Sequence, residues 1–157
     1  MGNLKLINLT SLNESQQKQL LNLWNNEYPV KLFYYHLIDF EKYLNTLSKS
    51  THILLVDSEN EIKGWAFSFV RENSRWFAII ISEKIQKKGY GKKLLDRLKF
   101  NETELNGWVI DYDSEKRSNG QSYKSPLDFY KKSGFEVLKD KRLETENISA
   151  VKIKWKN

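Results

Sequence analysis

The stretch Gln86-Lys87-Lys88-Gly89-Tyr90-Gly91 separates an apolar run at 76–81 from a helical pattern of leucines at 94, 95 and 98. Two glycines in such a turn let the backbone bend tightly and approach a ligand without interference from Cβ atoms. The first N–H groups of the following helix point into the same space, and the positive end of the helix dipole favours an anion there. Lys87, Lys88, Lys92 and Lys93 add positive charge around the glycines. The turn is therefore a candidate site for a pyrophosphate group.

The turn fits neither of the two common phosphate-binding motifs. A Walker loop needs four residues between its first glycine and a Gly-Lys-Ser/Thr, whereas only Tyr90 separates Gly89 from Gly91. A dinucleotide-binding fingerprint needs a third glycine three residues after the second, where this chain has Leu94. An ordinary strand-to-helix turn would also explain two glycines, so the motif alone does not identify a ligand.

Upstream of the turn, hydrophobic periodicity predicts a strand at 4–9, two helices and an antiparallel meander. The first helix is expected to begin at the capping pair Asn13 and Gln16 and to end at Pro29, and the second covers 37–47. The meander strands are expected at 52–56, 62–70 and 76–82, with polar turns between them. The strand at 76–82 is apolar on both faces, which predicts a central strand covered on both sides.

Downstream of the turn, a helix with a basic outer face leads to a strand expected at 108–112. A strand–helix–strand crossover normally makes its two strands parallel, so the sheet is predicted to be mixed. A polar loop at 113–124 precedes a short helix, which Ser125 caps and Pro126 begins, and Gly134 closes it. Strands at 135–138 and 148–155 are expected to complete an α/β fold of the α+β type.

The composition describes a single domain and excludes several kinds of chemistry. The chain has 157 residues, a formal net charge of +6, two histidines and no cysteine, which excludes disulfides, thiolate zinc sites and cysteine nucleophiles, and no metal is expected. The acidic residues are interspersed with the basic ones, so a nucleic-acid partner is not expected although the pI is near 9.3. No apolar run approaches the ~20 residues that cross a bilayer, so no membrane partner and a cytoplasmic location are predicted.

Two motifs together resemble the GNAT acetyltransferase superfamily: the Q-x-x-G-x-G turn after a hydrophobic strand, and Phe129-Tyr130-Lys131-Lys132-Ser133-Gly134-Phe135 further along the chain. The order of predicted elements agrees over most of the chain. The resemblance implies one domain over residues 1–157, with a central mixed sheet of six to seven strands and about four helices. It also implies acetyl transfer from acetyl-CoA, by direct attack, to a primary amine of a small molecule or peptide. A homodimer is left open.

The resemblance also assigns residues to the cosubstrate. The pantetheine arm would pair with the exposed edge of the strand through Ile79, Ile80 and Ile81, and Ile81 or its neighbour would supply the N–H that holds the oxyanion. The pyrophosphate would be held by backbone N–H groups, from the residues Gln86, Lys87, Lys88, Gly89, Tyr90, Gly91 and Lys92. Among these only Gly89 and Gly91 depend on side-chain identity, because a Cβ there would crowd the phosphates.

The family's usual general acid is the tyrosine of the second motif, which corresponds to Tyr130. A phenol with a pKa near 10 can protonate a departing thiolate, although Tyr130 would also suit the apolar core. Many relatives place a carboxylate base on the central strand, where this chain has Phe77 and Ala78. Asp111 is the first choice for the base.

Three further residues and a water chain remain open as the base, namely Asp113, Glu27 and His36. An aspartate at a strand end also commonly caps the chain or stays solvated, so Asp111 has a purely structural alternative.

The acceptor is only weakly specified. An aromatic wall from Tyr34, Tyr35, His36 and Tyr112, together with the acidic candidates above, would favour a cationic amine such as a polyamine, an aminoglycoside or a peptide N-terminus. An acyl-CoA-binding module without efficient catalysis is the alternative, because the strand carboxylate is missing. A basic domain that binds nucleic acid or protein is favoured least.

Overall fold

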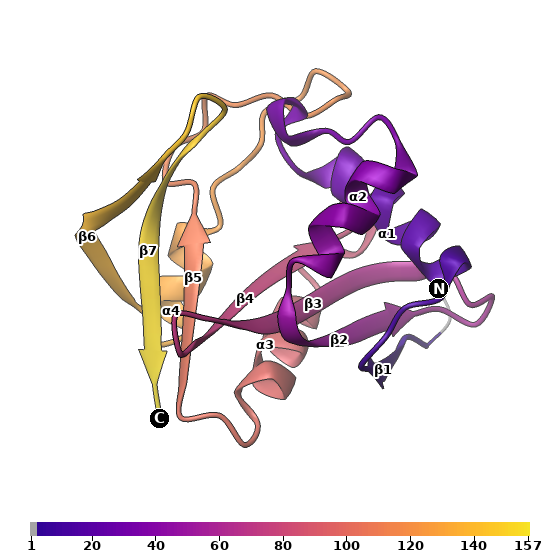
Figure 1. Cartoon of the computed structure of the whole chain (residues 1–157), viewed down its shortest axis with the longest axis horizontal. Helices are drawn as coiled ribbons and strands as arrows, with labels where there is room; N and C mark the ends of the chain where they lie inside the picture. The colour runs from indigo at the N-terminus through magenta and orange to yellow at the C-terminus, as the bar shows by residue number, and fades with distance from the viewer. Residues whose placement is uncertain (1–2) are drawn as a thin grey trace.

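The computed structural model describes residues 3–157, which form a seven-stranded mixed sheet with helices on both faces (Figure 1). The sheet order is β1-β2-β3-β4-β5-β7-β6. The strands are β1 Lys5–Leu9, β2 Ser48–Val56, β3 Ile62–Arg71, β4 Ser74–Ile81, β5 Glu104–Val109, β6 Glu136–Glu144 and β7 Ser149–Lys156. The α-helices are α1 Glu14–Glu27, α2 Leu37–Asn45, α3 Tyr90–Lys99 and α4 Leu127–Lys132, and the short 3-10 helices are η1 Val30–Leu32 and η2 Glu83–Ile85.

Most of the elements predicted from the sequence are confirmed. Asn13 and Gln16 form the expected capping box, in which each side chain accepts a hydrogen bond from the other residue's backbone N–H, at 2.8 and 2.9 Å. Strands β2, β3 and β4 form the antiparallel meander, and β4 lies at the centre of the sheet, parallel to β5. The mixed α+β architecture therefore follows from local patterns in the sequence.

Two hydrophobic cores lie on opposite faces of the sheet. Helices α1 and α2 cover one face, where Phe40 packs against both Trp24 and Trp65. Helices α3 and α4 cover the other face, with Leu94 and Tyr130 among the buried residues (Figure 1). Strand β4 contributes to both cores, because its side chains alternate between the two faces.

Several predicted boundaries were wrong, and the errors in strands arise where polar residues form part of the strand. Strand β2 begins at Ser48 rather than at 52, and α2 ends at Asn45 rather than at 47. The strand expected at 108–112 is β5, which begins at Glu104, and the buried Asn106 within it donates a hydrogen bond to the backbone carbonyl of Arg75 at 3.0 Å. Strand β6 continues through a charged run to Glu144 past an irregularity in its pairing with β7. Pro126 is the N-cap of α4 rather than its first residue, and Ser125 Oγ accepts a hydrogen bond from the N–H of Leu127.

Candidate active site

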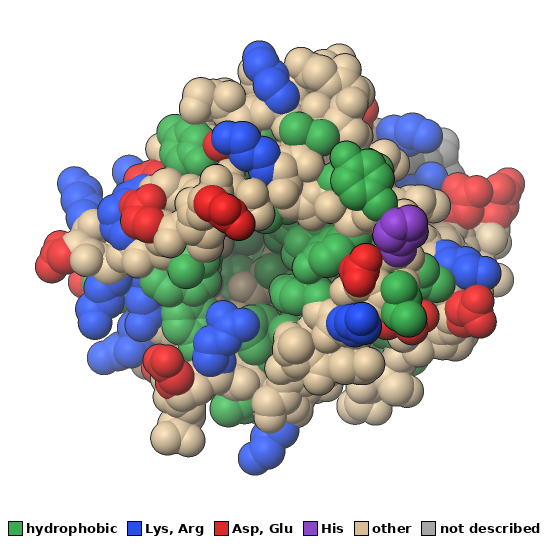
Figure 2. Space-filling model, turned by 45° about the horizontal axis from the view of Figure 1, so that its top comes forward, with side chains coloured by type: hydrophobic (Ala, Val, Ile, Leu, Met, Phe, Trp, Pro, Cys, Tyr) green, Lys and Arg blue, Asp and Glu red, His purple; other side chains and the backbone are tan. Residues whose placement is uncertain are grey.

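A cleft opens where β4 and β5 separate. The two parallel strands pair at a single position, Trp76 with Asn106, whereas β5 pairs with β7 along its whole length. Beyond this position β4 continues to Ile81 with no strand on its β5 side (Figure 1). Figure 2 shows a hollow in this face of the molecule that is lined mainly by hydrophobic side chains. We refer to this hollow as the cleft.

The open edge of β4 presents backbone groups from alternate residues. Ser82 N–H donates to the carbonyl of Lys63 in β3 at 2.9 Å, and β3 and β4 pair in regular antiparallel register. Because successive residues of a strand direct their N–H and C=O groups to opposite sides, Ile80 bonds to β3, while Ile79 and Ile81 direct theirs to the open side. Of the three isoleucines expected to contact the pantetheine arm, Ile79 and Ile81 therefore face the open side, although the carbonyl of Ile81 accepts a hydrogen bond from the side chain of Gln86.

The glycine turn lies at the end of the same strand. Gly89 is the N-cap of α3 and has a φ of +86°, a conformation that favours glycine. A Cβ atom on Gly91 would come within 3.2 Å of Phe129 Cζ. Gln86 Nε2 donates to the carbonyl of Ile81 at 2.9 Å and ties the turn back to the strand. Gly89 is thus favoured by its backbone conformation, and a side chain at position 91 would be in tight contact with Phe129.

The turn has the electrostatic character of an anion site. The backbone N–H groups of Tyr90, Gly91 and Lys92 donate no hydrogen bond within residues 3–157, as expected for the first turn of a helix. No acidic residue lies in this first turn. Lys87 and Lys88 are exposed next to it, and Lys92 Nζ is paired with Asp96 at 2.8 Å. Free donors, a helix dipole and nearby lysines together favour a bound phosphate.

Tyr130 lies on α4 with its ring buried and its hydroxyl unpaired. The ring packs edge-on against Phe77 and Phe135, with centroids 5.6 and 5.4 Å away, and only 5% of the residue is exposed. The hydroxyl makes no hydrogen bond to residues 3–157. Because it is not one of the side-chain atoms that are both fully buried and unpaired, it is not completely enclosed. Burial, and to a smaller extent the neighbouring Tyr123, raise the pKa of Tyr130 above its usual value near 10. The phenol therefore stays protonated at neutral pH.

The carboxylates considered as bases are all engaged by other groups. Asp111 accepts two hydrogen bonds from Arg142 in β6, both at 3.0 Å, and Asp113 accepts one from the N–H of Ser125 at 2.8 Å. The bond to Arg142 holds the pKa of Asp111 below its usual range, which makes this carboxylate a poorer proton acceptor. His36 is exposed at the N-cap of α2. The structure thus gives Asp111 a role in fixing β6 that the sequence did not predict.

A substitution separates the two roles of Asp111. We expect Asp111→Asn to lower the melting temperature at pH 7 by about 1–3 °C, because a partly exposed ion pair contributes little, and to leave kcat nearly unchanged. Since the folded-state pKa of Asp111 is lowered, the pair stabilises the fold above the pKa of the unfolded chain, and this contribution is lost as the pH falls through the folded-state pKa. The difference in melting temperature should therefore vanish in acid. A kcat below about a tenth of wild type would instead support Asp111 as the base.

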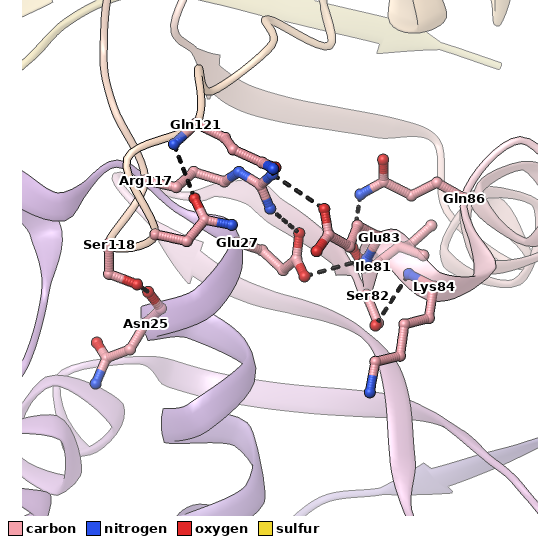
Figure 3. Close-up of polar contacts among 11 residues, drawn as sticks. Asn25, Glu27, Ile81, Ser82, Glu83, Lys84, Gln86, Arg117, Ser118 and Gln121 are labelled. Atoms are coloured by element: carbon pink, nitrogen blue, oxygen red, sulfur yellow. Dashed lines mark hydrogen bonds and ion pairs between the residues drawn. The ribbon is translucent and has the colours of Figure 1, made fainter.

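Glu27 belongs to a polar network at the edge of the cleft (Figure 3). Its Oε1 lies 3.3 Å from Arg117 Nη1, and its Oε2 accepts a hydrogen bond from the N–H of Glu83 at 3.1 Å. Arg117 Nη2 also contacts the carboxylate of Glu83 at 3.0 Å and Gln121 Oε1 at 2.7 Å. Burial raises the pKa of Glu27, and the hydrogen bond from Glu83 and the charge of Arg117 oppose this effect. The network joins α1, the end of β4 and the loop after β5.

Tyrosines from separate elements gather around Trp24 and Tyr28. Tyr28, Tyr34 and Tyr43 surround Trp24, at centroid distances of 4.6, 5.6 and 5.2 Å, and Tyr123 lies 6.4 Å from Tyr28. Sequence reasoning missed Tyr28, Tyr43 and Tyr123 as candidate site residues. The first two have the spacing of ordinary core residues, and Tyr123 lies in a polar loop without periodicity.

Of the aromatic wall expected from the sequence, only Tyr34 joins these tyrosines. Tyr35 is 79% exposed, and His36 is exposed beside it. The hydroxyl of Tyr112 donates a hydrogen bond to Glu115 at 2.9 Å and accepts one from the N–H of Ser149. Tyr112 therefore has a structural role in fixing the loop that follows β5.

Comparison with known proteins agrees with this geometry. Residues 13–157 match the family model described as an acetyltransferase (GNAT) domain, and no curated protein sequence matches the chain. Among solved structures, a GNAT-family acetyltransferase from Staphylococcus aureus has a TM-score of 0.68 at 15% identity, covering 98% of this chain and 99% of that one. A spermidine/spermine N-acetyltransferase from Vibrio cholerae has a TM-score of 0.62 at 17% identity, covering 96% and 91%.

At these identities the structural neighbours establish only the fold, but the family model spans most of the chain. Within residues 3–157, no helix is long and apolar enough to span a membrane, and no cluster of three or more metal-binding side chains is present. The chain belongs to the GNAT family of acetyltransferases.

Proposed function

We propose that this chain transfers an acetyl group from acetyl-CoA to a primary amine by direct attack. The observation that carries the proposal is the separation of β4 from β5, which leaves the backbone groups of Ile79 and the N–H of Ile81 open on the strand that leads to the glycine turn. An extended amide chain can pair with such an edge as an additional strand, and its diphosphate would reach the free N–H groups of α3. A single elongated ligand with both features fits this arrangement.

The residues that would hold the pyrophosphate are the turn residues Gln86, Lys87, Lys88, Gly89, Tyr90, Gly91 and Lys92. Of these, Tyr90, Gly91 and Lys92 supply the free N–H groups of the helix, and Gln86 fixes the turn through its side chain. Lys87 has a φ of +64°, so the chain also bends on the strand side of Gly89. Successive N–H groups at such a bend form a concave site for an anion.

The reaction then requires few charged side chains. The amine nitrogen attacks the thioester carbon as a neutral base, having lost its proton to water in the cleft, because Asp111, Asp113 and Glu27 are engaged elsewhere. Negative charge that develops on the carbonyl oxygen is stabilised by a backbone N–H of the open edge, at Ile79 or Ile81. After the attack the nitrogen carries an extra proton, which it releases to water. As the C–S bond breaks, Tyr130 gives its proton to the sulfur, and the phenolate then regains a proton from solvent. The products are the N-acetyl amine and free CoA.

A thermal shift measurement tests the cosubstrate. A ligand at 100 times its Kd stabilises the folded protein by roughly 2.7 kcal/mol, which corresponds to a shift of about 5–10 °C for a domain of this size. We expect acetyl-CoA and CoA to produce a shift in this range and ATP to produce little, because ATP lacks the arm that pairs with β4. Equal shifts with ATP and CoA would show that the turn binds phosphate without the strand edge.

A non-catalytic acyl-CoA-binding module remains the second candidate, and one observation favours it. The β4 positions where many relatives carry a base are Phe77 and Ala78, and no described candidate carboxylate replaces them. A single assay distinguishes the two functions. An acetyltransferase releases free CoA in the presence of an amine panel, whereas a binding module takes up acetyl-CoA and releases none.

A further inference from the structure

Residues 113–124, which we call the strap, cross from the end of β5 to the C-terminal end of α1 and return to α4 (Figure 1). The strap forms a small hairpin of its own, in which Arg117 N–H donates to the carbonyl of Gln121 at 2.8 Å. It is held against α1 and the chain that follows it: Ser118 Oγ donates to the carbonyl of Asn25 in α1 at 3.1 Å, and Val30 N–H donates to the carbonyl of Lys116 at 2.7 Å. The loop is therefore ordered by contacts with a helix far away in the sequence.

Arg117 is the one strap side chain in this network that contacts both Glu27 at the end of α1 and Glu83 in η2, directly after β4 (Figure 3). Its side chain is only 11% exposed, and that of Glu27 is 10% exposed. A buried ion pair of this kind contributes little net stability, but removal of one partner leaves a buried charge unpaired. The arginine also contacts Glu83, the first residue of η2 directly after β4. One side chain thus fixes the strap relative to the strand that would bind acetyl-CoA.

The strap carries Tyr123 towards the proton donor. Tyr123 N–H donates to the carbonyl of Glu115 at 2.8 Å, which fixes the backbone next to the buried Glu115, and its ring lies 6.4 Å from that of Tyr28. Burial, and to a smaller extent Tyr123, raise the pKa of Tyr130. The strap therefore fixes Tyr123 beside Tyr28, the residue that ends α1.

We propose that Arg117 is a positioning residue. Its contacts with Glu27 and Glu83, which we call the clasp, hold the strap in place so that Tyr123 forms part of the wall of the amine site. This inference rests on the proposed acetyl transfer and adds to it a residue that controls the acceptor side alone. Loss of the clasp frees the strap without removing a group from the open edge of β4 or from the glycine turn. Removal of the Arg117 side chain should therefore weaken binding of the amine and leave binding of acetyl-CoA nearly unchanged.

The test compares Arg117→Ala with wild type, using the amine from a panel of spermidine, tyramine and a short peptide that gives the fastest release of CoA. We expect the KM for this amine to rise by about tenfold or more, because a displaced wall misplaces the acceptor. The Kd of acetyl-CoA should change by less than about twofold. Arg117→Lys should show an intermediate KM, because one ammonium keeps the charge but cannot contact both carboxylates. Glu27→Gln should add little to Arg117→Ala if the two residues act as a unit.

Arg75→Ala is the matched control. Arg75 is also largely buried, at 16% exposure, and donates to the carbonyl of Lys49 and to the hydroxyls of Thr51 and Ser68 at the opposite end of the sheet. We expect it to lower stability and to leave the KM for the amine unchanged. An equal rise in KM for both variants, or a parallel loss of acetyl-CoA binding in Arg117→Ala, would overturn the proposal.

Hydrogen exchange gives a readout that does not depend on turnover. In Arg117→Ala the strap amides, including those of Arg117 and Tyr123, should exchange faster than in wild type, while amides of β4 should not. Unchanged exchange in the strap would overturn the clasp even if no amine supported turnover. Absence of CoA release by wild type with the whole panel would count against the proposed transfer itself, so the two failures are distinguishable.

Discussion

Replacement of Tyr130 by phenylalanine is expected to lower kcat by about 10²- to 10⁴-fold, the usual contribution of a general acid. The substitution removes the hydroxyl and leaves the ring, which packs between Phe77 and Phe135. Because the hydroxyl has no hydrogen-bond partner within the described residues, its loss leaves no buried group unsatisfied. The melting temperature, the KM for the amine and the Kd of acetyl-CoA should therefore stay close to wild type.

Tyr112→Phe is a suitable control, because the Tyr112 hydroxyl bonds to Glu115 and Ser149. We expect the opposite pattern for it, with a loss of stability of about 1 kcal/mol and a nearly unchanged kcat. The raised pKa of Tyr130 adds a second test, since an acid that acts in its protonated form should lose activity only above its pKa. Wild-type kcat should not fall on the alkaline side below about pH 10. A Tyr130→Phe variant with wild-type turnover would exclude the phenol as the donor.

The glycine turn and the tyrosine motif could be located from the sequence because each is a local pattern. The φ of Gly89 and the free N–H groups of α3 are consequences of a few neighbouring residues. Likewise, the central place of β4 follows from its apolar character on both faces. Such features need no knowledge of distant partners.

The polar part of the site could not be predicted in the same way. Arg117 and Glu27 are 90 positions apart, and Asp111 and Arg142 are 31 apart, so no local pattern pairs them. The sequence around Asp111 does not distinguish a free carboxylate that could act as a base from one that is paired with Arg142. Asn106 shows the same difficulty in the fold, because a buried asparagine within β5 looks like a loop residue until its partner on β4 is known.

Gly89→Val is expected to abolish most of the binding of acetyl-CoA, raising its Kd by about 100-fold or more. At a φ of +86° a β-branched residue is strained, so the turn should move away from the conformation that directs the N–H groups of α3. A Cβ on Gly89 would meet no atom of the free protein within 4 Å, which means that the space around it is open. Loss of two charge-assisted hydrogen bonds, at about 1.5–3 kcal/mol each, accounts for an effect of roughly this size.

Gly120→Val separates ligand binding from backbone strain. Gly120 has nearly the same φ, +85°, and a Cβ on it would likewise meet no atom within 4 Å, but it lies at the tip of the strap. Both variants should therefore lose similar stability without ligand, as measured by thermal melting. Only Gly89→Val should lose the shift produced by acetyl-CoA, because only Gly89 adjoins the free N–H groups at the start of α3. If both variants kept the shift, the diphosphate would not bind at this turn, and if both lost it, the loss would reflect strain in the fold rather than the site.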